Sequence, residues 1–417
     1  MSRHSFAPHP WRVILLLSLV TGVAYLVRAD VAVAQERMAP AVGITMIGMG
    51  AITAWGFQLS YALFQVPAGM FGERFGARSA LALALIGCSV ASFITSTMPG
   101  EGAVLTLVST RVLLGIAQAA VFPVAAMAVM IYVPVTERVL ATSIYIATAS
   151  LGAAAAPLLM APVMERFGWR AVFGLSGVIA SVTALVWVAL MPPRPPYPEQ
   201  PDAFRVRPGV LPELRTLVRN IPLLRLSLAY LLHSAVWFVF VFWFFRYLTE
   251  GRGFTILASG RWGGLPSLAA LVLAPLIGMA TDRLGRRIGS ARARRIAAMA
   301  CLFSAAGFVA AGAILPSAIL AILALSLSTG CVNGAEGPFF MTATALGVES
   351  PGAAAGVLNL MGNLGGVLSI WLVPRMSEAW GWNGTLVFWS GVCLVAALLW
   401  LTVDIDAAAP DGWPRTV

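Results

Sequence analysis

The sequence predicts an all-α membrane protein with twelve transmembrane helices, arranged as two six-helix bundles with pseudo-two-fold symmetry. Three observations lead to this prediction: the composition, the number of apolar stretches and an internal repeat. Of the 417 residues, 59% are hydrophobic and only 11% are charged, whereas a soluble domain carries about 25% charged residues. The mean hydropathy is +0.87. A soluble enzyme is excluded by this composition.

Apolar stretches of membrane-spanning length recur along the whole chain. A helix that crosses a bilayer needs about 20 mostly apolar residues, and such stretches, with their intervening polar loops, can be counted directly in the sequence. We predict twelve spans, at 13–34, 43–70, 79–98, 103–131, 138–162, 170–191, 223–248, 260–281, 296–314, 317–345, 353–375 and 383–403.

The two halves of the chain resemble each other. Glu73-Arg74 recurs as Asp282-Arg283 after 209 residues, and Gly168-Trp169 recurs as Gly381-Trp382 after 213 residues. Two copies of a helical unit related by an axis along the membrane normal are typical of membrane transporters. The segment between them is rich in proline and arginine, which predicts an extended chain outside the membrane. We therefore expect an N-terminal bundle over 1–191, a cytoplasmic linker over 192–222 and a C-terminal bundle over 223–417.

The net charge of +10 reports topology rather than nucleic-acid binding. All the basic residues are arginines, and 18 of them fall in alternate loops against seven in the opposite loops. An excess of basic residues marks the cytoplasmic loops of membrane proteins. This pattern predicts a multi-pass protein of the bacterial inner (plasma) membrane with both termini in the cytoplasm, and no nucleic-acid partner.

The sequence predicts neither a cofactor nor a metal site. The four cysteines lie inside apolar runs, without CxxC spacing or a histidine cluster, so neither a zinc site nor a disulfide framework is indicated. The chain contains no lysine, which excludes the phosphate-binding loop of ATPases.

The loop after the second predicted span carries a recognisable pattern. The run Gly69-Met-Phe-Gly-Glu73-Arg74-Phe-Gly76-Ala-Arg78 has a second copy, Gly278-Met-Ala-Thr-Asp282-Arg283-Leu-Gly285-Arg286-Arg287. Both resemble the major facilitator loop signature G-x-x-x-D-R-x-G-x-R. An acid in such a loop can pair with a neighbouring arginine and with a helix N-terminus, and such a pairing can form in one conformation and break in another. We expect a conformational latch made of Glu73, Arg74, Arg78, Asp282, Arg283 and Arg286.

Further motifs resemble the anion:cation symporter branch of that superfamily, which includes bacterial sugar-acid transporters and vesicular glutamate and sialic-acid carriers. They are the Tyr25–Arg28 region of helix 1, the run Arg111-Val-Leu-Leu-Gly115-Ile-Ala-Gln118 of helix 4, and Gly356-Val-Leu-Asn359-Leu-Met-Gly362-Asn363 of helix 11. Tyr61-x-x-x-Gln65 also matches the branch. The resemblance implies a secondary transporter of a small organic anion, a carboxylate or sugar acid, that works by alternating access. It implies substrate-binding roles for Arg28, Arg111, Tyr25, Tyr61, Gln65, Gln118, Asn359 and Asn363.

Two departures from the branch concern proton coupling. In the branch, a carboxylate precedes the helix 1 arginine and another lies on helix 4, and both are linked to coupling. Here these positions are Val27 and Gln118, neither of which titrates. Coupling to protons would therefore use a non-standard acid, for which Glu336 and Asp30 are the candidates.

The intramembrane charges support anion binding on physical grounds. An ionisable side chain within a membrane helix is costly and indicates a functional site. Arg28 offers a planar fork that suits a carboxylate. Arg111 shares a helical face with Gln118, and its alternative role is to extend to the membrane interface. Asp30 lies one turn beyond Val27, and its alternative role is helix packing.

Two other functions remain open from the sequence. A multidrug or lipid exporter of the same fold would use an apolar site with an unpaired acid, which the arginines argue against. A non-transporting membrane receptor or assembly subunit is consistent with the missing carboxylates. We expect the chain to be a monomer in the lipid bilayer, with a small organic anion as its ligand, protons as the candidate coupling ion, and no enzymatic activity.

Overall fold

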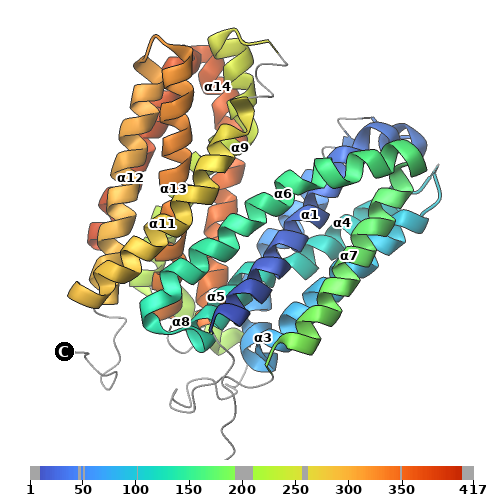
Figure 1. Cartoon of the computed structure of the whole chain (residues 1–417), viewed down its shortest axis with the longest axis horizontal. Coiled ribbons are helices and arrows are strands. Elements are labelled where there is room, and N and C mark those ends of the chain that lie inside the picture. The colour runs from blue at the N-terminus through green and yellow to red at the C-terminus, as the bar shows by residue number, and fades with distance from the viewer. Residues whose placement is uncertain are drawn as a thin grey trace, which may run out of the picture. The chain divides into compact units, whose positions relative to one another are not determined.

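The computed structural model describes residues 10–45, 48–49, 52–100, 102–192, 210–255, 262–347 and 350–405. The regular structure in these ranges is helical (Figure 1). Ten of the described helical stretches are long and apolar enough to cross a membrane. The chain divides into two compact units, unit 1 with Met1–Val133, Thr148–Val210 and Glu349–Gly356, and unit 2 with Pro134–Ala147, Leu211–Val348 and Val357–Val417.

Unit 1 is built from the helices of the first half of the chain. In it, α3 packs against α4 and α7, and α1 packs against α7 and α5. These helices are drawn in blue to green in Figure 1. The elements are α1 (Pro10–Val42), the π-helix η1 (Ile52–Leu59), α3 (Ser60–Thr97), α4 (Val104–Gln118), α5 (Val121–Tyr132), the part of α6 (Arg138–Phe167) from Thr148 onward, α7 (Trp169–Leu190), and the start of α14 (Pro351–Leu399) up to Gly356.

Unit 2 contains the helices of the second half. In it, α13 packs against α11, α12 and α9, and these helices run in yellow to red in Figure 1. The elements are the 3-10 helix η2 (Val135–Glu137), α6 up to Ala147, α8 (Val210–Arg219), α9 (Ile221–Arg246), the π-helix η4 (Tyr247–Gly251), α11 (Leu265–Ile288), α12 (Ser290–Ile314), α13 (Ala318–Leu346), α14 (Pro351–Leu399) from Val357 onward, and the 3-10 helix η5 (Trp400–Thr402).

Four of the seven glycines with positive φ in the described residues mark sharp turns that bear on the predicted spans. Gly76 (φ 80°) breaks α3 and Gly381 (φ 68°) breaks α14, while Gly168 (φ 81°) precedes α7 and Gly289 (φ 90°) separates α11 from α12. Only glycine adopts this backbone conformation without a steric penalty. The breaks in α3 and α14 fall between predicted spans. Helix α14 holds most of the two spans 353–375 and 383–403, whereas α3 holds the end of the span 43–70 and nearly all of the span 79–98.

The repeat is less regular in the structure than in the sequence. Gly285 occupies the motif position of Gly76, yet it lies inside α11, and the chain turns at Gly289 instead. The shift of four residues corresponds to about one helical turn. The predicted end of this span at residue 281 was therefore too early, because α11 carries the motif on an additional turn.

The predicted span 103–131 corresponds to one candidate span, Val104–Tyr132, in which a turn separates two helices. The chain forms α4 up to Gln118, then a turn at 119–120, then α5. Pro123 lacks a backbone N–H and cannot donate to the carbonyl of Ala119. The chain therefore lacks one helical hydrogen bond at this turn.

The expected linker is partly helical. Residues 193–209 lie outside the described residues, but Val210–Arg219 forms helix α8, where we had expected an extended chain. Leu217 is buried whereas Val218 is exposed. This burial pattern is that of an amphipathic helix, which forms once the proline-rich part of the segment has ended.

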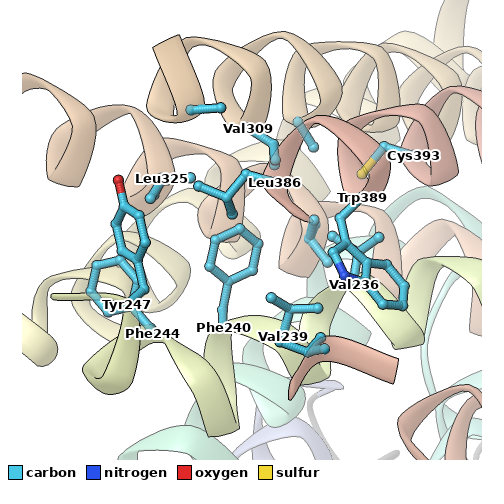
Figure 2. Close-up of a cluster of buried hydrophobic side chains, with 14 of the residues drawn as sticks. Val236, Val239, Phe240, Phe244, Tyr247, Val309, Leu325, Leu386, Trp389 and Cys393 are labelled. Atoms are coloured by element: carbon cyan, nitrogen blue, oxygen red, sulfur yellow. The ribbon is translucent and has the colours of Figure 1, made fainter. Parts of the chain in front are cut away.

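The best-defined apolar core of unit 2 joins α9, α12, α13 and α14. Figure 2 shows Phe240 of α9 facing Leu386 of α14, with Val309 of α12 and Leu325 of α13 beside them. Trp389 and its neighbours close the cluster. Since apolar contact between membrane helices gains little from water exclusion, such close van der Waals packing holds the helices together.

Large apolar side chains also lie on the surface. Leu105 and Leu158 are each 78% exposed and Leu15 is 67% exposed. In water such side chains would be an aggregation liability, but against lipid they cost nothing. This surface agrees with a chain whose helices cross a bilayer.

Helices α1 and α6 cross closely within unit 1. A Cβ atom on Gly152 would meet the carbonyl carbon and Cα of Gly22 at 2.7 and 2.9 Å, and the hydroxyls of Thr21 and Thr148 are 3.1 Å apart. We expect Gly152→Ala to destabilise the protein by about 1–3 kcal/mol, because the backbones must separate. The matched control is Gly307→Ala, where nothing lies within 4 Å of the new methyl group. Melting curves in detergent measure both variants, and equal midpoints would contradict the predicted crossing.

Candidate functional site

Arg28 of α1 lies inside a cage of aromatic rings in unit 1. Its guanidinium carbon is 4.4 Å from the ring centre of Tyr25, 4.7 Å from that of Phe57 and 4.5 Å from that of Tyr61. Each ring face attracts a cation. Phe57 and Tyr61 are stacked on each other, with ring centres 5.6 Å apart. Arg28 is partly buried, and these three rings hold its charge in place.

The π-helix η1 supplies part of this cage. It carries Phe57 and leads directly into α3, which carries Tyr61. Gly56 allows η1 to approach α4, because a Cβ atom there would meet Cβ of Arg111 at 3.3 Å. The wide turn of a π-helix is frequent at functional sites. Here it places the rings of Phe57 and Tyr61, which lie about one helical turn apart, against the guanidinium of Arg28.

Gln118 of α4 orients the guanidinium. The Nε atom of Arg28 donates to Oε1 of Gln118 at 3.1 Å, and Nε2 of Gln118 donates to the backbone oxygen of Ala24 at 2.8 Å. The second bond fixes which amide atom faces Arg28. Because Gln118 is neutral, Arg28 gains a hydrogen bond but keeps its net positive charge.

Arg111 and Asp30 form a buried ion pair. Their side chains are 1% and 0% exposed, and Nη1 of Arg111 lies 3.8 Å from Oδ1 of Asp30. Nη2 of Arg111 also donates to the hydroxyl of Thr95 at 3.4 Å, and its guanidinium lies 5.4 Å from the ring of Phe173. Both residues are predicted functional candidates, but nothing in the sequence pattern indicates that they pair. The structure gives each of them a partner inside unit 1.

The other predicted residues of unit 1 are buried. Tyr61 is 2% exposed and Gln65 is 0% exposed, whereas Tyr25 is partly buried and packs edge-on against Phe122, with ring centres 5.8 Å apart. Tyr25 and Tyr61 therefore join Arg28 and Gln118 in one cluster. Gln65 lies one turn further along α3.

Asn359 and Asn363 lie on α14 in unit 2. The side-chain nitrogen of Asn363 donates to the backbone oxygen of Asn359 at 2.8 Å, and both side chains are largely buried. Between them, Gly362 lets α14 approach α9, because a Cβ atom there would meet the ring of Tyr230 at 2.5 Å. The glycine of this motif thus allows α14 and α9 to cross closely, next to the side-chain amides of Asn359 and Asn363.

Glu336 of α13 accepts a hydrogen bond from Tyr230 of α9. The hydroxyl lies 2.7 Å from Oε2 of Glu336, and the carboxylate is 8% exposed. Tyr230 is stacked on His233, whose Nε2 atom lies 2.8 Å from the backbone oxygen of Val332. Sequence reasoning selected Glu336 but missed Tyr230, which no motif marks.

The two latch acids both cap helix N-termini. Oε1 of Glu73 accepts from the backbone N–H of Ala353 at 2.9 Å, at the start of α14. The two oxygens of Asp282 accept from the N–H groups of Val139 and Leu140 at 3.2 and 2.8 Å, at the start of α6. The first N–H groups of a helix lack intrahelical partners and carry partial positive charge. The pairing with a helix N-terminus that the sequence predicted is present in both copies.

The arginines of the predicted latch do not share this role. Arg78 donates to the backbone oxygen of Val188 at 2.6 Å and holds the end of α7. Arg74, Arg283 and Arg286 are exposed, and Arg286 lies close enough to Asp282 to interact with it electrostatically. Sequence reasoning missed Arg294, which is 9% exposed, donates to the backbone oxygen of Met341 at 3.0 Å, and is close enough to Asp282 to interact electrostatically.

The family comparison matches most of the chain. The Major Facilitator Superfamily model matches residues 15–370. The sequence-based resemblance to this superfamily is confirmed by that match.

Curated relatives of the chain are named as transporters of organic anions. A D-galactonate transporter of Escherichia coli O6:H1 is 28% identical, over 94% of this chain and 95% of the relative. A probable galactarate/D-glucarate transporter of Bacillus subtilis is 25% identical, over 93% and 90%. A probable sulfoacetate transporter of Cupriavidus necator is 26% identical, over 95% and 94%. These names agree with the predicted sugar-acid branch.

Solved structures share the fold. The human organic anion transporter MFSD10 has a TM-score of 0.73 at 17% identity, covering 94% of this chain and 100% of that one. The Escherichia coli fucose:proton symporter FucP has a TM-score of 0.70 at 13% identity, covering 94% and 98%. At these identities the likeness shows a common fold alone.

Proposed function

Because this chain belongs to the Major Facilitator Superfamily, we propose that it is a secondary transporter that carries a small organic anion, a carboxylate or sugar acid, by alternating access. The relatives named above are transporters and not enzymes, as the sequence predicted. Their named substrates, galactonate, galactarate or glucarate and sulfoacetate, are all small hydrophilic anions.

One observation carries the proposal, namely that the charge of Arg28 has no acidic partner among the residues that the structure describes. Its guanidinium is held by three aromatic rings and by the neutral amide of Gln118. By contrast, the charge of Arg111 is balanced by Asp30. A bound carboxylate would complete the pairing of Arg28 with a charge-assisted hydrogen bond. A multidrug exporter would gain nothing from this charge, which favours an anion carrier.

The architecture of twelve spans in two six-helix bundles is part of the proposal. It is supported by the breaks at Gly76 and Gly381, since two of the ten candidate spans each contain two shorter helices. The distribution of arginines supports the bacterial inner membrane, with both termini and the linker over 192–222 in the cytoplasm. The bundles would comprise residues 1–191 and 223–417.

Alternating access would use the capped helix termini. Glu73 and Asp282 bind backbone N–H groups, which form strong but reversible contacts with a carboxylate. We propose that these contacts hold one conformation and are released in the other. The arginines of the two loops would contribute through their positive charge near the membrane surface.

Counterflow in proteoliposomes tests the function. Liposomes with purified protein are loaded with unlabelled D-galactonate and then given labelled D-galactonate outside. We expect transient accumulation of label that excess D-glucarate suppresses and neutral D-galactose does not. Absence of counterflow with D-galactonate, D-glucarate and sulfoacetate alike would favour the non-transporting receptor. Efflux of lipophilic cations in place of anions would favour the exporter.

Changing Gln118 to glutamate should give uptake a new dependence on pH. As the pH rises the new carboxyl ionises, pairs with Arg28 and competes with the substrate anion, so the apparent affinity should fall more steeply with pH than in the wild type. Gln118→Met is the control, because it removes the hydrogen bond without adding a titrating group. Initial rates of uptake across a pH series measure the effect, and superimposable profiles for wild type and Gln118→Glu would contradict it.

A further inference from the structure

Glu336 differs from Asp30, another acid that is buried within a membrane-spanning stretch. Asp30 is balanced by Arg111, whereas within the described residues Glu336 has no ion-pair partner and is bonded to the neutral hydroxyl of Tyr230. Burying a charge is costly unless an opposite charge is near. A carboxyl group can change its charge most easily where no fixed charge holds it in one state. Glu336 meets this condition and Asp30 does not.

Near Glu336, α13 contains a proline and two glycines that allow α11 and α6 to pack closely against it. Pro338 cannot donate to the carbonyl of Gly334, which loosens α13 at this point. A Cβ atom on Gly334 would meet Ile277 of α11, and one on Gly337 would meet Ser143 and Val139 of α6 at 2.8 and 3.0 Å. Irregular backbone within a membrane is tolerated where protein or water satisfies it.

The groups that face Glu336 are neutral aromatic side chains. Tyr230 of α9 donates to it, and His233 of α9 stacks on Tyr230. Tyr145 of α6 is fully buried and lies close enough to interact electrostatically with it. The charged groups of the surrounding helices gather separately, where α6 begins and around Met341 of α13. They are Asp282 of α11, Arg294 of α12 and Arg138 of α6.

The first turns of α6 lie over this part of α13. Val139 and Ser143 contact α13 at Gly337, the residue after Glu336, and Ser143 also contacts α11 at Gly278. The same helix end is capped by Asp282 through the N–H groups of Val139 and Leu140. The carboxylate of Asp282 therefore holds the start of α6, which packs beside Glu336.

We propose that Glu336 is the proton-binding site of the transport cycle, and that residues 138–147 of α6 cover it while Asp282 caps that helix. The inference rests on the proposed function, because it names the coupling ion and its site. When the cap is released, water reaches the carboxylate, which then takes up or loses one proton. Tyr230 donates its hydrogen bond to the ionised form.

Paired transport assays test the proton site. In Glu336→Gln, accumulation of labelled D-galactonate driven by a pH gradient should be lost, while counterflow at equal pH persists, because exchange requires no net proton transfer. The matched control is Glu250→Gln, an exposed acid paired with Arg246, which should keep both activities. If the Asp30→Asn variant still shows counterflow, it should also still accumulate D-galactonate when a pH gradient is applied. Retained accumulation in Glu336→Gln, or its selective loss in Asp30→Asn, would overturn the proposal.

Chemical labelling tests the cover without relying on transport. Dicyclohexylcarbodiimide modifies protonated carboxyl groups in apolar surroundings, and mass spectrometry locates the adduct. On the wild-type protein we expect slow modification of Glu336 that declines as the pH rises, and faster modification in Asp282→Asn. An absence of modification at every pH, or equal rates in the two proteins, would overturn the proposal.

The two assays separate the failure of this inference from that of the proposed function. If the wild type shows no counterflow with any of the three anions, the function fails, while labelling still decides whether Glu336 exchanges a proton. If counterflow is present and Glu336→Gln still accumulates D-galactonate, the inference alone fails. Labelling of the wild type also decides the question should Glu336→Gln fail to fold.

Discussion

Replacing Arg28 with lysine is expected to weaken substrate binding by about 1–3 kcal/mol, the range of a hydrogen bond to a charged group. Lysine keeps the positive charge but loses the planar fork, the stacking on Tyr25, Phe57 and Tyr61, and the bond to Gln118. Calorimetry with D-galactonate, or its concentration dependence in counterflow, measures the loss.

The matched control for this prediction is Arg170→Lys. Arg170 belongs to the same unit and also stacks on an aromatic ring, that of Trp169 at 4.3 Å, but it donates to the backbone oxygen of Met98 rather than to Gln118. We expect this variant to bind as the wild type does. An unchanged affinity in Arg28→Lys would remove Arg28 from the binding site.

Asp30→Ala should cost about 3–5 kcal/mol of stability, because it leaves the charge of Arg111 buried without its partner. The melting temperature in detergent should fall accordingly. The double variant Asp30→Leu with Arg111→Met removes both charges and fills the space, so it should recover most of the loss.

Counterflow in the same double variant tests the predicted substrate role of Arg111. If the ion pair is structural, the double variant should still exchange D-galactonate. If Arg111 itself holds the anion, exchange should be lost even though the melting temperature has recovered. A single Asp30→Ala variant as stable as the wild type would contradict the buried pair.

The sequence was a good guide to the helices because the membrane imposes a length and a composition on each of them. It was a poorer guide to where they bend. The break after α4 depends on Pro123, and the extra turn of α11 depends on which of two glycines, Gly285 or Gly289, adopts the left-handed conformation. Hydropathy carries no information on either choice.

The candidate site was predictable where a motif marks it. Arg28, Gln118 and the two latch acids were recognisable by their patterns, and the structure gives each of them defined partners. The partners themselves were not predictable. Phe57 and Tyr230 look like ordinary lipid-facing aromatics in the sequence, and only the π-helix and the packing of α9 on α13 bring them to Arg28 and Glu336.

The latch acids bind main-chain atoms, and this affects how the protein can evolve. Glu73 and Asp282 recognise N–H groups that every residue except proline possesses. The side chains at 139, 140 and 353 take no part in these hydrogen bonds, so no compensating partner needs to change when they vary. Correlated substitutions would therefore leave no trace of this contact in an alignment, whereas proline at any of these three positions should act as a natural loss-of-function allele.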